Sequence, residues 1–299
     1  MTDIEKLRTE SEARHTFAER RHTTRYGAAV NRYLGVIGYR SDEQSAPPVQ
    51  PKAVTTKTGV VLVGVDDSPI SYTAVDHAAI EADLRGWDLR ILHVQRPRGD
   101  RDAGASLLQR LTDRVHACAP AVPVAARLIV GSAAPLLLVE GRKADLVVVG
   151  HRHGTAGTVF GVSVGDRVAA DHTGVVLVVR VPGWPPGPGF GSRPIVVGVD
   201  GDDSPAVGFA HREARVRGCD LVLLHAGKAA RSGSVDTVGG VRMHRRFVAG
   251  DPATALIEAS DEAAALVIGR HGPAGVPAGI LGSVSRSVIK HAYCPVFLV

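Results

Sequence analysis

The sequence predicts an α/β fold of two tandem domains, each a doubly wound parallel sheet of five strands, with one helix missing from the second domain. Three observations predict it. The chain has 299 residues, enough for two domains. The strand candidates are continuous runs of Val, Ile and Leu, as expected when helices cover both faces of a parallel sheet. The same segments also occur twice in the same order.

The internal repeat consists of five matched pairs of segments. "GVVLVGVDDSP" (59–69) returns as "RPIVVGVDGDDSP" (193–205), and "ADLVVVGHRHG" (144–154) returns as "AALVIGRHG" (264–272). The other pairs are "DLRILHV" with "DLVLLHA", "ARLIVGSAAPLLL" with "RRFVAGDPATALI", and "VVLVV" with "CPVFLV". The spacing from Gly131 to Gly150 equals that from Gly250 to Gly269. We therefore interpret the chain as one unit written twice.

Each unit alternates strands with helices. In the first unit we predict strands at 60–65, 89–94, 125–130, 145–149 and 175–179, and helices at 70–85, 103–117, 133–142 and 164–171. In the second we predict strands at 194–199, 221–225, 242–248, 265–268 and 295–299, and helices at 205–217, 252–262 and 283–292. The glycine- and serine-rich stretch "GKAARSGSVDTVGG" shows no helical periodicity, so we expect a loop where the first unit has its second helix.

These segments divide the chain into four parts. Residues 1–58 form an extension that we expect to be partly disordered or loosely helical, and residues 59–180 form the first domain. A proline- and glycine-rich linker, 181–193, leads to the second domain, 194–299. We expect the two domains to pair with each other within one chain. Pairing of two whole chains stays open, because the apolar strand "CPVFLV" could attract another strand if exposed.

Charge and composition limit the partners. The net charge of +5 is concentrated in the first 40 residues, which favours an extension that docks on a partner or on the protein itself over a nucleic-acid-binding arm. No apolar stretch reaches the length of a membrane span, and no signal-like apolar core stands near the N-terminus. The three cysteines lack metal-type spacing and are read as reduced core residues rather than a disulfide or metal site. We expect a cytoplasmic protein that binds neither nucleic acid nor membranes.

A glycine-rich segment after the strand at 265–268 carries the main functional signal. Gly269, Gly272, Gly282 and Ser283 have the spacing G-x2-G-x9-G-S, and Ser285 follows. Glycines let main-chain amides approach a phosphate, and the start of the next helix favours an anion. We expect Ser283 to cap that helix and both hydroxyls to donate to phosphate. The alternative is a flexible loop without a ligand.

With this motif the chain resembles a tandem universal stress protein. The resemblance implies a Rossmann-like, adenine nucleotide alpha hydrolase-like fold of five parallel strands per domain, and implies ATP as ligand. By similarity, Asp200 at the end of the first strand contacts the nucleoside, and main chain at Ala226 contacts adenine. The residues carried over to the second domain are Val199, Asp200, Ala226, Gly250, Gly269, Gly272, Gly282, Ser283, Val284 and Ser285.

The first domain departs from this motif. His153 stands where the second glycine belongs, Ser163 and Val164 replace Gly-Ser, and Asp166 replaces the second hydroxyl. A carboxylate facing a triphosphate is repulsive in a partly desolvated site, so we expect this site to be weak or empty. Its remaining residues are Asp66, Val94, Gly150, His153 and Ser163. His151, Arg152 and His153 form either an anion-holding group or an exposed basic turn.

The second domain departs from the family's V-D-G-S by the sequence "VDGDDSP". Asp202 and Asp203 either reach a magnesium ion that accompanies ATP or form a solvated turn, and we favour the turn. No residues are predicted to ligate a resident metal.

No catalytic residues are predicted. A lysine of the Walker type is missing from the segment, and a triad of Ser283, His271 and Asp200 has no fixed geometry. His93 and His225 recur at the end of the second strand, which indicates a shared structural role. We expect a non-enzyme, with slow ATP hydrolysis left open.

The leading hypothesis is an adenine-nucleotide-binding protein of stress response or signalling. The alternative from another class is a scaffold with vestigial sites. A third, an enzyme that uses NAD or adenylates a substrate, is disfavoured because G-x-G-x-x-G does not follow the first strand of either unit.

Overall fold

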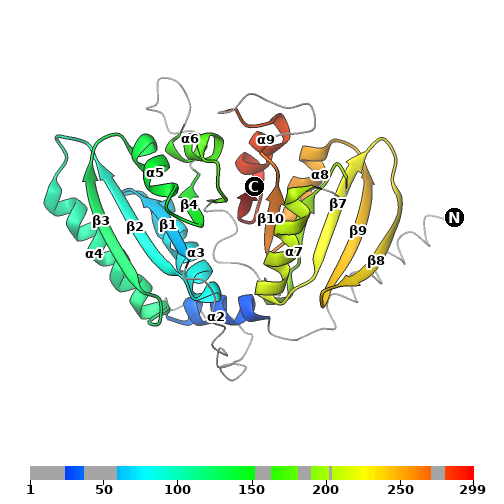
Figure 1. Ribbon diagram of the computed structural model, residues 1–299, viewed down its shortest axis with the longest axis horizontal. Helices are drawn as coiled ribbons and strands as arrows, with labels where there is room; N and C mark the ends of the chain where they lie inside the picture. The colour runs from blue at the N-terminus through cyan, green and yellow to red at the C-terminus, as the bar shows by residue number, and fades with distance from the viewer. Residues whose placement is uncertain (1–23, 37–58, 152–162, 181–189, 202–203, 271–279) are drawn as a thin grey trace.

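The computed structural model describes residues 24–36, 59–151, 163–180, 190–201, 204–270 and 280–299. Within these residues a single sheet of eleven strands runs through the whole molecule, in the order β3-β2-β1-β4-β5-β11-β10-β6-β7-β9-β8. Figure 1 shows its two halves side by side, with the amino-terminal half in cyan and green and the carboxy-terminal half in yellow and red.

The amino-terminal half, residues 59–180, contains five parallel strands. They are β1 (Val60–Val65), β2 (Asp88–Gln95), β3 (Val124–Val130), β4 (Leu146–Gly150) and β5 (Val176–Val179). Its helices are α3 (Pro69–Arg85), α4 (Arg101–Cys118), α5 (Ala133–Gly141) and α6 (Val164–Asp171). All nine predicted elements occur within two residues of their predicted bounds, because long apolar runs and helix caps are strong local signals.

The carboxy-terminal half, residues 194–299, repeats this arrangement with one change. Its parallel strands are β6 (Ile195–Gly198), β7 (Leu221–Gly227), β9 (Val241–Ala249), β10 (Ala265–Ile268) and β11 (Val296–Leu298). Its helices are α7 (Pro205–Arg217), α8 (Pro252–Ala259) and α9 (Ser283–His291), with short 3-10 turns η1 (Phe190–Ser192) just before the half and η2 (Ser260–Glu262) within it.

The stretch predicted as a loop between β7 and β9 is a strand, so that prediction was wrong. β8 (Arg231–Val238) runs antiparallel to β9, and the two form a hairpin at the outer edge of the sheet. Gly239 and Gly240 make the turn with φ of 55° and 81°. Two adjacent glycines with positive φ are typical of a tight hairpin turn, so the Gly-Gly pair was the signal that sequence reasoning missed.

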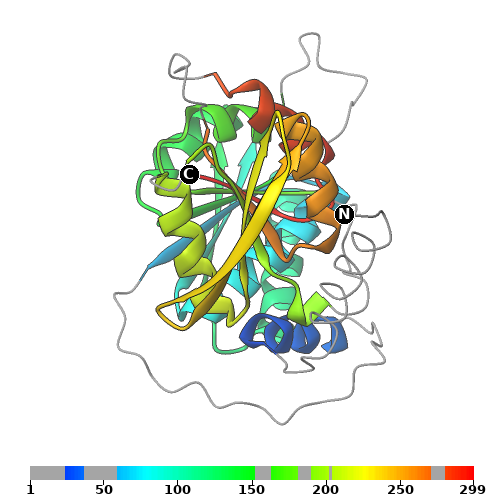
Figure 2. The same ribbon diagram turned by 90° about the vertical axis from the view of Figure 1, so that its right-hand side faces the viewer.

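Helices cover both faces of the sheet (Figure 2). One apolar cluster joins the sheet to α2 (Arg25–Val36), α3, α4 and α7, and a second joins its other face to α5, α6, α8 and α9. The three strands at the centre of the sheet, β5, β11 and β10, are consequently buried at every position. This explains why they are apolar throughout rather than alternating with polar residues.

The two halves meet at the last strand of each. β11 runs antiparallel to β5, with Phe297 opposite Leu177. All residues of both strands are buried. The segment "CPVFLV" is therefore an interior strand and not an exposed edge of this chain.

Helix α2 belongs to the amino-terminal extension and packs across the base of both halves (Figure 1). Tyr26, Val30, Tyr33 and Leu34 are buried beneath it. The Tyr33 hydroxyl donates to Asp76 of α3, and the ring of Tyr26 lies 5.2 Å from that of Phe190. This part of the extension thus docks on the body of the protein as an ordered amphipathic helix.

Four buried charged side chains connect α3 with α7. Arg85 Nη2 donates to both carboxylate oxygens of Glu213 at 2.6 Å, and Arg85 Nη1 contacts Glu81. Arg217 pairs with Glu81 and Glu213. The burial of Glu213 disfavours its charge, but Arg85 and Arg217 outweigh this and hold its pKa below the usual value. The four charges balance, so the cluster is neutral as a whole.

None of the described helices is long and apolar enough to span a membrane. The three cysteines carry free thiols; Cys118 and Cys294 are buried and Cys219 is half-buried.

Candidate functional site

The predicted site residues that the structure describes lie near the carboxyl ends of the strands. β1 lies between β2 and β4, and β6 lies between β7 and β10. In each half the sheet therefore extends from its first strand to both sides, and the strand order reverses at that strand. Such switch points are where open α/β sheets bind ligands. Gly272, His153, Asp202, Asp203, Arg152 and His271 lie outside the described residues, and their predicted roles stay predictions.

The strand ends of the carboxy-terminal half bring Val199, Asp200 and Ala226 near one another. The amide of Val199 donates to the Leu224 carbonyl at 3.1 Å, and His225 Nδ1 donates to the Val199 carbonyl at 3.1 Å. Asp200 follows directly and is exposed, while Ala226 is half-buried one residue beyond the histidine. This is the predicted nucleoside end of the site.

The amino-terminal half repeats the histidine contact. His93 Nδ1 donates to the Val65 carbonyl at 3.0 Å, and Val94 follows in β2. A carbonyl oxygen only accepts, so Nδ1 carries the proton in both histidines. Each histidine therefore fixes the end of the first strand, which is a shared structural role.

Asp66, the counterpart of Asp200, has local partners. Its carboxylate accepts from the amide of Ser68 at 3.1 Å and from the Ser71 hydroxyl at 2.9 Å. These contacts draw the carboxylate to the start of α3. The nucleoside end of this half keeps the predicted aspartate, but its Oδ1 is already hydrogen-bonded.

Gly131 and Gly250, which lie equally far along the chain from Gly150 and Gly269, turn the chain at the end of the third parallel strand of each half. Gly250 has φ of 130° and its amide donates to the Gly227 carbonyl at 2.9 Å. Gly131 has φ of 154° and makes the same bond to the Gln95 carbonyl at 2.9 Å. Positive φ favours glycine, which explains why both repeats carry one here.

The described part of the phosphate end consists of Gly269 and the start of α9. Gly282 occupies the N-cap position, so the prediction that Ser283 caps the helix was wrong: Ser283 is its first residue. No described side chain caps α9. The first-turn amides of this helix thus point toward the predicted anion position without a side-chain acceptor from the described chain.

Ser285 ties α9 to the end of β10. Its hydroxyl is buried and donates to the Gly269 carbonyl at 2.7 Å. A hydroxyl has one proton, so in this arrangement Ser285 does not also donate to a phosphate. Val284 is half-buried against the apolar cluster on this face of the sheet.

The start of α6 in the amino-terminal half is capped by its own side chains. The amide of Asp166 donates to Ser163 Oγ at 3.0 Å, and the Asp166 carboxylate accepts from the Ser163 amide at 3.1 Å. This is a capping box with aspartate as its acidic member. The carboxylate that sequence reasoning treated as repulsive therefore also occupies the helix start.

His151 completes this arrangement. It is buried, and its Nε2 lies 3.1 Å from Asp166 Oδ1, so it is not part of an exposed basic turn. Burial raises the pKa of Asp166, but the bonds from His151 and Ser163 outweigh burial and lower it below its usual value. An anion from within the chain is thus held at the phosphate end of the first site.

Gly165 allows α6 to pack directly on the end of β4. A methyl group on Gly165 would come within 2.6 Å of the Gly150 carbonyl oxygen. The aligned residue of the other half is Val284, so the two helix starts approach their strands differently.

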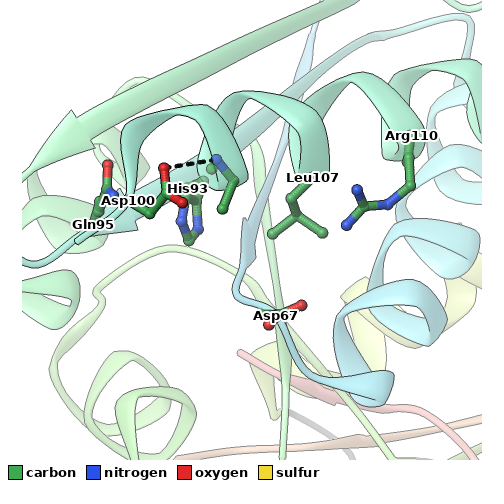
Figure 3. Close-up of a pocket in the computed structure, with 8 residues that line it drawn as sticks. Asp67, His93, Gln95, Asp100, Leu107 and Arg110 are labelled. Carbon is green, nitrogen blue, oxygen red and sulfur yellow. Dashed lines mark hydrogen bonds between the residues drawn. The ribbon is translucent and has the colours of Figure 1, made fainter.

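A pocket of about 320 Å³ opens beside the nucleoside end of the amino-terminal half (Figure 3). Its lining includes Asp67 after β1, His93 and Gln95 of β2, and Leu107 and Arg110 of α4. Neither Asp66 nor Val94 lines it. Helix α4 forms one wall, and because β8 replaces that helix in the other half, the two sites have different surroundings.

The fold defines the class of the protein: an α/β protein with a mostly parallel sheet wound twice. A model of the Universal stress protein family matches residues 58–180 and 228–299. The chain belongs to the universal stress protein family, in its tandem form. The second match begins after β7 and does not include β6, α7 or β7.

Curated relatives and a solved structure agree with this. A universal stress protein of Mycobacterium tuberculosis (strain H37Rv) is 30% identical over 310 residues, covering 82% of this chain and 96% of the relative. A universal stress protein of Mycolicibacterium smegmatis is 30% identical over 285 residues, covering 80% and 96%. The crystal structure of a universal stress protein from Archaeoglobus fulgidus has the same fold, with a TM-score of 0.62, 17% identity, and coverage of 81% of this chain and 98% of that one.

Proposed function

We propose that this protein binds an adenine nucleotide, ATP in particular, mainly through its carboxy-terminal half, and acts in the cytoplasm in stress response or signalling. It is not primarily an enzyme. The observation that carries the proposal is the contrast between the two helix starts beyond Gly150 and Gly269.

In the amino-terminal half, Ser163 and Asp166 satisfy the start of α6. In the carboxy-terminal half, Gly282 occupies the N-cap position of α9, and no described side chain accepts a hydrogen bond from the first-turn amides. The amides and dipole at a helix start favour an anion. A phosphate group at α9 would supply an acceptor for a first-turn amide, as Ser163 Oγ does for the Asp166 amide at α6.

The nucleoside end supports an adenine nucleotide rather than a simple anion. Asp200 is exposed at the end of β6, where its carboxylate can accept from the ligand. Main chain near Ala226 borders the same edge, with Gly250 beyond it. ATP as the nucleotide follows from the family resemblance and the G-x2-G-x9-G-S spacing; a magnesium ion would accompany its phosphates.

The pairing of β5 with β11 supports a single chain as the functional unit. In this arrangement the amino-terminal half supplies the neighbouring strand that the carboxy-terminal half would otherwise need from a second copy.

Calorimetric titration of the full chain with ATP and Mg²⁺ tests the proposal, using the wild type and Gly282→Asp. Aspartate is a favoured N-cap residue, so this variant keeps α9 while placing a carboxylate at the anion position, as in the amino-terminal half. We expect saturable binding by the wild type and at least about a tenfold weaker affinity in the variant, the size of one lost charge-assisted contact.

Gly35→Asp is the matched control, because it adds the same charge at an exposed position of α2 with open space around it. It should bind ATP like the wild type. A wild-type protein without saturable binding at physiological nucleotide concentrations would overturn the proposal and favour the scaffold hypothesis.

A further inference from the structure

Arg270 follows Gly269 directly, and its side chain crosses from the carboxy-terminal half into the amino-terminal half. Its Nε donates to the Ala169 carbonyl at 3.3 Å, and Nη2 donates to the Gly174 carbonyl. Ala169 lies in the last turn of α6, and Gly174 lies just beyond that helix. A cation at a helix C-terminus is favourable because the carbonyl ends carry partial negative charge.

The side chain is buried. Arg270 is 8% exposed, and among the described residues no carboxylate pairs with it. Burial lowers its pKa. A buried guanidinium without a counter-ion is costly unless carbonyls satisfy its protons, so the two bonds into the amino-terminal half hold this side chain in one place.

The main chain of Arg270 connects the elements of the proposed site. Its amide donates to the Val299 carbonyl at 3.2 Å, and its carbonyl accepts from the Gly282 amide at 2.9 Å. Gly282 is the N-cap of α9, so the residue anchored in the amino-terminal half also holds the start of the proposed phosphate-binding helix.

The aligned residue of the other half behaves differently. The amide of His151 bonds the Val179 carbonyl at 2.8 Å, as Arg270 bonds Val299. Its side chain, however, pairs with Asp166 in its own half. Arg270 thus connects the amino-terminal half to the site that is proposed to be functional.

We infer that Arg270 is a positioning residue that makes the amino-terminal half a structural part of the nucleotide site in the carboxy-terminal half. The inference rests on the proposed function. It predicts that the spacing of Gly269 and Gly282, and with it the affinity for ATP, depends on contacts made to α6 on the far side of the β5–β11 junction.

Arg180 provides the matched control. It crosses the junction in the opposite direction, and its Nη1 donates to the carbonyl of Ala292 at the C-terminal end of α9 at 2.7 Å. Arg180→Met thus removes a comparable contact between the halves without touching Gly269, Arg270 or Gly282.

The experiment compares the full-length wild type, Arg270→Met, Arg270→Lys and Arg180→Met by two measurements. ATP affinity is measured by calorimetry with Mg²⁺. Hydrogen exchange of the Gly282 amide is measured without nucleotide, with the Ala292 amide as reference for α9 itself. We expect Arg270→Met to weaken ATP binding roughly tenfold and to speed Gly282 exchange, and Arg270→Lys to change both less.

Arg180→Met should leave ATP affinity within about twofold. The inference is overturned if Arg270→Met changes neither measurement, or if Arg180→Met weakens ATP binding as much. If Arg270→Met does not fold, the same two measurements on Arg270→Lys against Arg180→Met decide. Should the wild type bind no ATP, the proposed function fails, and Gly282 exchange still tests whether Arg270 holds this helix start.

Discussion

His151 Nε2 and Asp166 Oδ1 lie 3.1 Å apart at the start of α6, and the aligned positions of the other half hold Arg270 and Ser285. These two aligned positions therefore carry different contacts in the two repeats. In one half the histidine and the aspartate retain an internal anion at the helix start. In the other half the Arg270 side chain donates to a carbonyl of the amino-terminal half, and the Ser285 hydroxyl donates to the Gly269 carbonyl.

Replacing Asp166 with serine tests this internal anion. Asp166→Ser removes the carboxylate that the Ser163 amide and His151 hold. We expect the variant to bind a second ATP, so that calorimetric stoichiometry rises from one to two, while loss of the capping contact costs about 1 kcal/mol of stability.

Asp171→Ser is the control, since Asp171 is exposed at the other end of the same helix. It should leave the stoichiometry at one. If Asp166→Ser also binds a single ATP, the carboxylate is not what closes the amino-terminal site.

The buried charge cluster between α3 and α7 predicts a large stability effect. Glu213→Gln keeps the shape of the side chain but leaves Arg85 and Arg217 with one carboxylate between them. We expect a loss of about 3–5 kcal/mol in the free energy of unfolding, as when one partner of a buried ion pair is removed. Urea denaturation followed by circular dichroism measures it.

The surface pair of Arg32 with Asp83 supplies the comparison. Its nitrogen and oxygen lie 2.8 Å apart, but half of the Arg32 side chain is exposed. Arg32→Ala should cost less than about 1 kcal/mol. Equal losses in the two variants would contradict the role assigned to burial.

His77 predicts a pH dependence of stability. It is buried in α3, where burial, together with the positive charge of Arg217, lowers its pKa from 6.5 to about 3. Between these values the unfolded chain binds a proton that the folded protein does not. The free energy of unfolding should therefore be highest above pH 6.5 and fall as the pH drops, by up to about 1.4 kcal/mol per pH unit from this residue.

His77→Gln, which stays neutral, should flatten the stability curve between pH 6.5 and 4, measured by urea denaturation at each pH. The exposed His116→Gln should leave the curve as in the wild type. An unchanged slope in His77→Gln between pH 6.5 and 4 would contradict a lowered pKa of His77 in the folded protein.

Local signals located most of the fold. Apolar runs such as Leu146–Gly150 and caps such as Ser204 before α7 specify a strand or a helix within a few residues of chain, so their bounds could be predicted closely. The hairpin of β8 was missed because its residues are mostly polar and all exposed, and such an edge strand depends on the backbone of its neighbour β9.

The site shows the same division. The spacing of Gly269 and Gly282 pointed to a strand end followed by a helix start, which the structure contains. Sequence could not reveal that Ser285 bonds the Gly269 carbonyl, since that contact joins residues brought together by the packing of α9 on β10. Likewise, Asp166 was identified as a departure from the motif, but its partner His151 lies fifteen positions away, just beyond the end of β4.

The order of residues along the chain was sufficient to reveal the repeat, its family and the glycines at the strand ends, because each is written in short segments that can be read and compared without knowing how they pack. How the halves combine depends on the folding of the whole chain: β5 pairs with β11, α2 packs across both halves, and Arg270 donates to the Ala169 carbonyl. Those contacts join residues far apart along the chain, 43 positions for Tyr33 and Asp76 and 101 positions for Arg270 and Ala169. Their formation depends on burial and geometry that no local pattern encodes.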